Sequence, residues 1–154
     1  MKQTKNRLRL CVGLLVLNIL FIWGNSLMPG SVSGAISGWL RDILANIFPA
    51  GSEDPDAGHG LLRKLAHFTE FACLGALFTW FYAILRKKVW LALGCGLLVA
   101  AVDETIQCFI PDRGPSIWDV LLDFSGVLLG VSIWIVIWAV RQRNYFIKSI
   151  WRKK

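Results

Sequence analysis

The amino-acid sequence predicts an all-α, polytopic membrane protein, built as a four-transmembrane-helix bundle with an outer amphipathic interfacial helix. The 154 residues are 55% hydrophobic and the mean hydropathy is +0.54, which is unusual for a soluble protein. Four apolar stretches, at about 8–28, 65–85, 89–110 and 117–140, are long enough to span a bilayer. A helix needs about 20 mainly apolar residues to cross about 30 Å of hydrocarbon. At this length we expect a single membrane domain over residues 1–154.

The charged residues predict the orientation of these spans. Most of the 17 Lys and Arg residues cluster before the first stretch, between the second and third, and after the fourth, whereas all ten Asp and Glu residues fall on the opposite side or in that half of the spans. Loops rich in Lys and Arg stay in the cytoplasm, so both termini are predicted to be cytoplasmic. The net charge of +7 then comes from short clusters beside the membrane, which attract lipid head groups. No nucleic-acid partner is expected.

The first stretch, 8–28, follows a basic start and could be mistaken for a signal peptide. Its apolar run is long and no small-x-small cleavage site follows it, so an uncleaved span is the better interpretation. Asn18 and Asn25 lie within it, and we expect them to hydrogen-bond to other helices.

The outer segment, 29–60, contains a predicted amphipathic helix over about 32–48. Its apolar residues follow the three-four spacing of one helical face, and they are Val32, Ile36, Trp39, Leu40, Ile43, Leu44, Ile47 and Phe48. Such a helix either lies in the outer membrane interface or packs over the other spans as a cap. Residues 51–58 read as a flexible acidic linker.

The second and third stretches place charged groups at similar depth. Lys64, His67 and Glu70 are spaced by three, so they share one side of a helix. At 1.5 Å per residue, Glu70 lies roughly 10–14 Å below the outer end, and Asp103 of the third stretch lies at about 10 Å. Asp103 and the adjacent Glu104 are costly at that depth unless a cation, a proton or a metal accompanies them.

Further polar residues are predicted to join the same layer. Gln107 follows on the third stretch, and Arg113 is the only cation of the outer turn after it. Ser116 and Asp119 have the form of a helix-capping box, but capping does not explain Asp123 one turn deeper. Three helices are therefore expected to bring polar groups together about 10 Å below the outer surface.

Gly126 and Gly130 continue the face of Asp119 and Asp123 as a small-xxx-small pair, which lets another helix approach closely. They are also candidates for a homo-oligomer contact. The alternative to a functional site is a structural role for the charged layer, in which an ion-pair network with Lys64 and Arg113 only holds the helices together.

Metal binding and acid–base chemistry are two interpretations of the buried groups. His67, Glu70, Asp103, Glu104 and Asp123 are candidate ligands of a divalent metal, since oxygen-rich sites suit Mg²⁺, Ca²⁺ or Mn²⁺ and His with carboxylates suits Zn²⁺. Alternatively, Glu70, Asp103, Glu104 and His67 act as catalytic acid and base. The sequence does not say whether the protein is an enzyme, and the cofactor is unknown beyond this candidate metal.

Recognition without turnover is a third interpretation. Lys64 and Arg113 suit a phosphate or a carboxylate, and carboxylates suit sugar hydroxyls or an amine. Gln107, Asp119 and Asp123 complete the candidate substrate-binding set. No serine or cysteine stands in an evident nucleophile setting, so covalent acyl transfer is not expected.

The order and spacing of these residues, from about Arg63 to Gly130, resemble the VanZ-like family of small bacterial integral membrane proteins. The residues that carry the resemblance form three blocks: Lys64-x-x-His67-Phe68-x-Glu70-Phe71-x-x-Leu74-Gly75, Asp103-Glu104-x-x-Gln107-x-x-x-Pro111-x-Arg113, and Ser116-x-x-Asp119-Val120-x-x-Asp123-x-x-Gly126-x-x-x-Gly130. Asp123 stands where the family often has Asn.

The resemblance implies a location in the bacterial cytoplasmic membrane and a role in the cell envelope. The family's namesake is associated with resistance to the lipidated glycopeptide teicoplanin. The leading hypothesis is a protein that binds or modifies a lipid-linked envelope molecule at the outer leaflet, lowering susceptibility to teicoplanin-type lipoglycopeptides. The alternatives are a non-catalytic lipid- or antibiotic-binding module and, less favoured, a small transporter acting as an oligomer.

Overall fold

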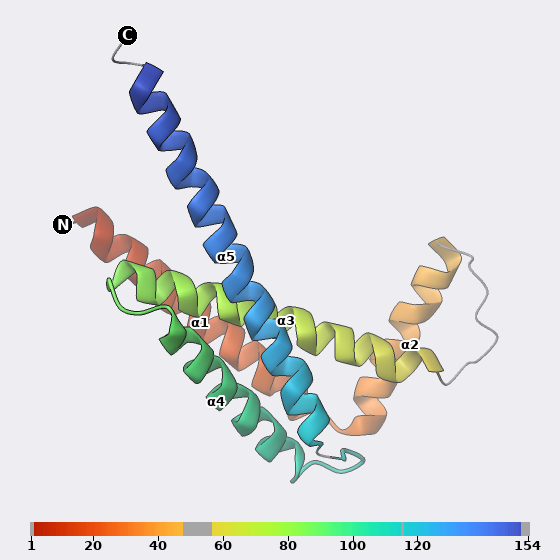
Figure 1. The fold of residues 1–154 in the computed structure, drawn as a ribbon. Helices are drawn as coiled ribbons and strands as arrows, with labels where there is room; N and C mark the ends of the chain where they lie inside the picture. Colours follow the sequence, from red (N-terminus) through yellow and green to blue (C-terminus); the bar gives the residue numbers. More distant parts are fainter. Residues whose placement is uncertain (1, 48–56, 115, 152–154) are drawn as a thin grey trace.

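The computed structural model describes residues 2–47, 57–114 and 116–151, and within them the ordered secondary structure is helical, without strands. Figure 1 shows α1, α3, α4 and α5 gathered into a bundle, with α2 running across the direction of α1 at one end. We call this the α2 end of the bundle, and it also contains the turn between α4 and α5. The bounds are α1 Lys2–Ser26, α2 Gly30–Ile47, α3 Ala57–Ile84, α4 Trp90–Gln107 and α5 Ile117–Trp151.

Three helices of the described chain, α1, α4 and α5, are long and apolar enough to cross a membrane. The helix α3 has sufficient length, but His67, Thr69 and Glu70 lower the hydropathy of its first half. The prediction of an all-helical membrane protein is therefore supported, whereas the crossing by α3 stays a proposal.

Three predicted boundaries differ from the observed ones by more than three residues. The helix α1 begins at Lys2, before the predicted start at 8. The helix α3 begins at Ala57, well before the predicted start at 65, and α5 continues to Trp151, beyond the predicted end at 140. No proline lies inside any of these extensions, so nothing in the chain interrupts these helices where the apolar stretch stops. The acidic linker predicted at 51–58 falls largely outside the described residues, and its last two positions belong to α3.

The burial pattern is the reverse of that in a soluble protein. Asp103 and Asp123 are 0% and 2% exposed, while large apolar side chains cover the outside of the bundle, such as Leu17 on α1, Leu98 on α4 and Val136 on α5. Large apolar surfaces of this kind are rare on soluble monomers, and charged residues of membrane helices typically face the bundle interior. The bundle therefore suits a lipid surrounding.

The helices α3 and α5 form the most extensive interface of the fold. Glycines let their backbones meet: a Cβ atom on Gly126 would collide with the carbonyl oxygen of Phe68, and one on Gly130 with that of Ala72. The predicted close approach of a helix to the two glycines is thus confirmed, and the approaching helix is α3 of the same chain.

The amphipathic helix predicted at 32–48 corresponds to α2, and Phe48 lies outside the described residues. Val32, Ile36 and Trp39, from its apolar face, are 47%, 51% and 67% exposed, whereas Ser37 is buried. The helix α2 contacts α3, and these three side chains of its apolar face are exposed. Both the interfacial helix and the cap stay proposals.

Candidate functional site

The side chain of Asp103 lies at the centre of the polar site. Its Oδ2 atom accepts hydrogen bonds from Ser26 Oγ at 2.8 Å and from Gln107 Nε2 at 3.0 Å. His67 Nδ1 lies 3.9 Å from the same oxygen, whereas the buried Oδ1 atom has no hydrogen-bond partner among the described residues. Asp103 thus bonds to Gln107, which lies one turn away on its own helix, and α1 adds a hydroxyl donor.

Asp123 of α5 joins His67 and Asp103 in the interior. One ligand atom from each of these three residues lies within 4.8 Å of the others, and all three residues are buried. The structure thus brings polar residues of α3, α4 and α5 into one layer, as their spacing indicated.

The other two buried carboxylates have their own partners. Glu70 Oε1 accepts a hydrogen bond of 2.8 Å from Asn25 Nδ2, which confirms that Asn25 bonds to another helix. The buried Oδ1 atom of Asn18, by contrast, has no hydrogen-bond partner among the described residues. Glu104 Oε2 accepts a hydrogen bond of 3.0 Å from the backbone N–H of Ser116, just before α5. Glu70 and Glu104 therefore tie α1 to α3 and α4 to α5, and neither belongs to the three-residue group.

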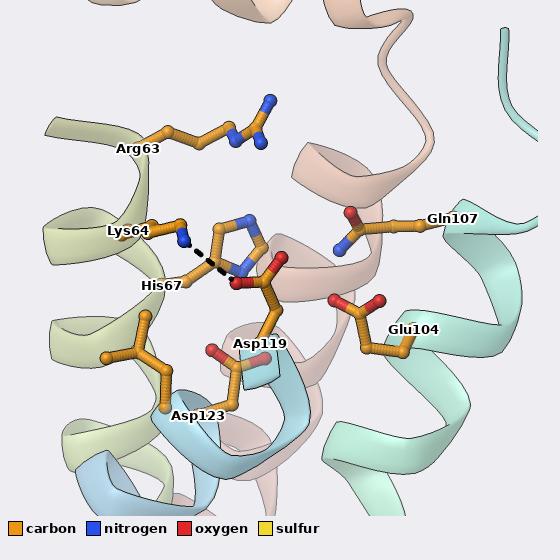
Figure 2. A pocket seen from close by; sticks show the side chains of 8 residues that line it. Arg63, Lys64, His67, Glu104, Gln107, Asp119 and Asp123 are labelled. Atoms are coloured by element: carbon orange, nitrogen blue, oxygen red, sulfur yellow. Dashed lines mark ion pairs between the residues drawn. The ribbon is translucent and has the colours of Figure 1, made fainter. Parts of the chain in front are cut away.

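At the start of α5, Ser116 caps the helix, but the predicted capping box with Asp119 is not formed, because the Ser116 N–H is bonded to Glu104. Ser116 Oγ accepts a hydrogen bond of 3.2 Å from the Trp118 N–H, which caps the helix. The carboxylate of Asp119 instead pairs with Lys64 Nζ at 3.3 Å, as Figure 2 shows. This pair is at the rim, with half of the Lys64 side chain exposed, and exposed pairs of this kind contribute little to stability.

Arg113 acts as a clamp between two connecting segments. Its guanidinium donates to the carbonyl oxygens of Met28 at 3.3 Å and Asn25 at 3.1 Å, and to Gln107 Oε1 at 3.5 Å. Burial first, and then the nearby Arg63, lowers the pKa of Arg113, yet a guanidinium remains charged in proteins. In the alternative of a purely structural ion-pair network, Arg113 would pair with a carboxylate, whereas these bonds go to neutral oxygens. Its predicted role in binding an anionic ligand stays a proposal.

Two cavities meet at His67. The smaller, of about 10 Å³, is shown in Figure 2, and it is lined by Arg63, Lys64, His67, Glu104, Gln107, Asp119, Leu122 and Asp123. The larger, of about 140 Å³, lies between α2, α3 and the end of α1, and it is lined by Asn25, Met28, Ser33, Ile36, Ser37, Leu62, Arg63, Ala66, His67, Glu70 and Arg113. His67 and Arg63 line both cavities. Of the other charged residues on this side of α3, Lys64 lines only the smaller cavity and Glu70 only the larger one.

Sequence reasoning did not select Ser26 and Arg63. Ser26 is 0% exposed at the end of an apolar helix. A buried hydroxyl needs a hydrogen-bond partner, but the sequence does not show that this hydroxyl is buried. Arg63 precedes Lys64, and its position on the helical face next to His67 could have been inferred from the spacing of four.

Comparison with known proteins supports the resemblance seen in the motif blocks. The family model described as VanZ/LLP1 matches residues 11–138, which cover all the site residues on α1, α3, α4 and α5. Neither the curated proteins nor the solved structures gave a match to this chain. On the extent of the family match, this chain belongs to the VanZ/LLP1 family.

Proposed function

We propose that this VanZ/LLP1 protein crosses the bacterial cytoplasmic membrane four times, with both termini in the cytoplasm. The burial pattern of α3 supports its role as the fourth span. Leu61 and Leu65 are 59% and 52% exposed, whereas His67 is buried and Glu70 is bonded to α1. His67 and Glu70 therefore face protein, whereas Leu61 and Leu65 remain for lipid. The basic residues near both termini and in the 86–88 hairpin then place the α2 end outside.

Cysteine labelling tests this orientation. In a background with the natural cysteines replaced by serine, Asp112→Cys should react with a membrane-impermeant maleimide in intact cells. Lys88→Cys should react only after the cells are opened. Both positions are exposed, so accessibility from the membrane side is the variable that differs. Labelling of Lys88→Cys in intact cells would overturn the proposed orientation.

We further propose that the site at the α2 end binds or modifies a lipid-linked molecule of the cell envelope. The observation that carries this proposal is the larger cavity, because its lining is basic at one part and apolar at another. Arg63 and Arg113 suit a phosphate or carboxylate. Met28, Ile36 and Leu62 suit a hydrocarbon chain, and Ile36 belongs to the exposed face of α2.

This arrangement fits a ligand that enters sideways from the lipid. The apolar part of such a molecule would lie along α2, and its anionic head would reach Arg63 and His67. Lys64 and Asp119 at the rim, with Gln107 and Asp123 deeper in the smaller cavity, would contact the part of the head group that lies farthest from the chain. If teicoplanin-type lipoglycopeptides, or the lipids near them, bind in the larger cavity, the susceptibility of the cell to these drugs would fall.

An enzyme and a binding module differ in whether their function depends on the charge of the Glu104 carboxylate. The Glu104→Gln variant keeps an oxygen that can accept the Ser116 N–H bond, so the helix contact is preserved while the charge is removed. An enzyme that uses this carboxylate as acid, base or charge stabiliser would lose at least about 100-fold of its rate, whereas a binding module would retain its ligand affinity largely intact.

Drug susceptibility is the test of the resistance proposal. A teicoplanin-sensitive Gram-positive host would express wild type, Arg63→Gln or Lys88→Gln at matched membrane levels, with vancomycin as the non-lipidated comparison. Protection against teicoplanin that is lost in Arg63→Gln and kept in the matched control Lys88→Gln would support binding in the larger cavity. Equal protection by wild type against both drugs, or none against either, would refute the selective handling of a lipidated ligand.

Self-association stays a proposal of its own. Gly126 and Gly130 are covered by α3 within the chain, so a homo-oligomer would use another face, such as the exposed apolar side of α1 or α5. A transporter function would require such an oligomer and remains the weaker alternative.

A further inference from the structure

The deepest part of the site holds three side chains that are typical metal ligands and that come from three different helices. His67, Asp103 and Asp123 are 8%, 0% and 2% exposed, and one ligand atom from each lies within 4.8 Å of the others. Two carboxylates buried side by side repel each other and lose their hydration. A cation between them would offset both costs.

Two polar atoms of this group lack a hydrogen-bond partner in the described part of the chain. His67 Nδ1 and Asp103 Oδ1 are buried and have no hydrogen-bond partner among the described residues, although buried polar groups are nearly always paired. The other oxygen of Asp103 is held by Ser26 and Gln107, and outer partners of this kind orient the ligands in metal sites. One face of the carboxylate is thus fixed, and the other is left for a ligand.

The neighbouring carboxylates lie outside this group by distance, because only its three members bring ligand atoms within 4.8 Å of one another among the described residues. Glu70 Oε2, like Asp103 Oδ1, is buried without a hydrogen-bond partner in that part of the chain. Glu70 accepts from Asn25, and Glu104 accepts from the backbone of Ser116. The lysine at the rim pairs with Asp119 and so does not neutralise the buried pair directly.

We propose that His67, Asp103 and Asp123 bind one divalent cation of the Zn²⁺ or Mn²⁺ class. An imidazole nitrogen with two carboxylate oxygens suits these ions, whereas Mg²⁺ and Ca²⁺ prefer oxygen ligands throughout. With bonds of about 2.0–2.2 Å at tetrahedral angles, two ligand atoms lie about 3.5 Å apart. The ligand atoms, now within 4.8 Å of one another, would therefore move closer together by up to about 1.3 Å when the ion binds.

Three protein ligands leave at least one coordination position open, as in catalytic zinc sites. The cavity of about 10 Å³ beside His67 and Asp123 is close to the smallest volume that holds a water molecule. A water molecule, or an oxygen atom of a bound head group, would therefore occupy the open coordination position from this cavity, which Arg63 also lines. The cation site can exist whether or not the ligand of the larger cavity is lipid-linked.

Metal content is measured on the full chain, purified with a tag that contains no histidine. Its thiols are alkylated first, because Cys73 and Cys108 are exposed and would bind Zn²⁺ themselves. The protein is treated with a chelator, titrated with Zn²⁺ or Mn²⁺ alone, desalted and assayed by elemental analysis. We expect about one ion per wild-type chain for at least one of the two metals.

The variants decide which residues hold the ion. Asp123→Asn and His67→Gln should raise the dissociation constant at least about 100-fold, since loss of even an outer-shell partner costs about 10–100-fold. The matched controls Glu70→Gln and Glu104→Gln should retain the ion. Each protein must elute as one symmetric peak, and Asp103→Asn is added where it does so.

Absence of stoichiometric binding to wild type, or equal binding by wild type and Asp123→Asn, would overturn the proposal. So would loss of the ion in Glu70→Gln, because that residue is outside the group. Neither result depends on any lipid or antibiotic, so a failure here is distinct from a failure of the susceptibility test.

Discussion

The glycine contact between α3 and α5 allows a quantitative test of what holds the site together. In Gly130→Ala, the added methyl group would collide with the carbonyl oxygen of Ala72, which belongs to helix backbone and cannot rotate away. Overpacking costs about 1–3 kcal/mol, and a backbone obstacle belongs at the upper end. The gain from alanine over glycine in a helix is about 1 kcal/mol. We expect Gly130→Ala to lower the free energy of unfolding by about 2 kcal/mol.

Gly94→Ala in α4 is the matched control, because nothing lies within 4 Å of its added Cβ atom. It should gain about 1 kcal/mol, so the two variants should differ by about 3 kcal/mol. Thermal unfolding is followed in one detergent with a thiol-reactive dye, in a background where Cys73, Cys95 and Cys108 are replaced by serine. The dye then reports the exposure of Cys11, which is 0% exposed when folded. Equal stability of the two variants would refute the packing argument. A change of oligomeric state in Gly130→Ala alone would show that the glycine face serves another copy of the chain.

Three further predictions concern the polar site and α2. Ser26→Ala removes one of the two hydrogen-bond donors to Asp103, and it should lower stability by about 1–3 kcal/mol in the dye assay; no loss would show that the bond is not made. Lys64→Gln breaks the rim pair with Asp119 and should change stability by less than about 1 kcal/mol, so a larger loss would show that the pair is shielded from solvent. Trp39→Phe should remove part of the fluorescence that brominated lipids quench, because this side chain is 67% exposed; unchanged quenching would place α2 outside the membrane interface.

The sequence predicted the parts of the structure that depend on periodicity. Helical spacing places Asp103 with Gln107, and the depths counted along the stretches bring His67, Asp103 and Asp123 together. A charge inside an apolar stretch is conspicuous, because its cost in a bilayer requires a partner or a function.

The parts that could not be predicted depend on which helices become neighbours. Ser26 looks like any small residue near a helix end until α1 lies against α4. Arg113 looks like an anion ligand, and its bonds to backbone carbonyls appear only when the α4–α5 turn meets the end of α1. Hydropathy also does not predict where α3 begins or α5 ends, because it reports the apolar stretch and a helix can extend into water.

The position of Asn25 and Ser26 on α1 has a consequence for how the chain enters the membrane. In the proposed four-span topology, Glu70 and Asp103 enter the bilayer on later helices, and each finds its hydrogen-bond donor on the helix that is synthesised first. An isolated α3 would insert poorly, since a carboxylate at depth costs about 2.5–3.5 kcal/mol during insertion. We therefore expect α1 to supply hydrogen-bond donors to α3 during biosynthesis, so that α3 enters the lipid together with α1 and not alone.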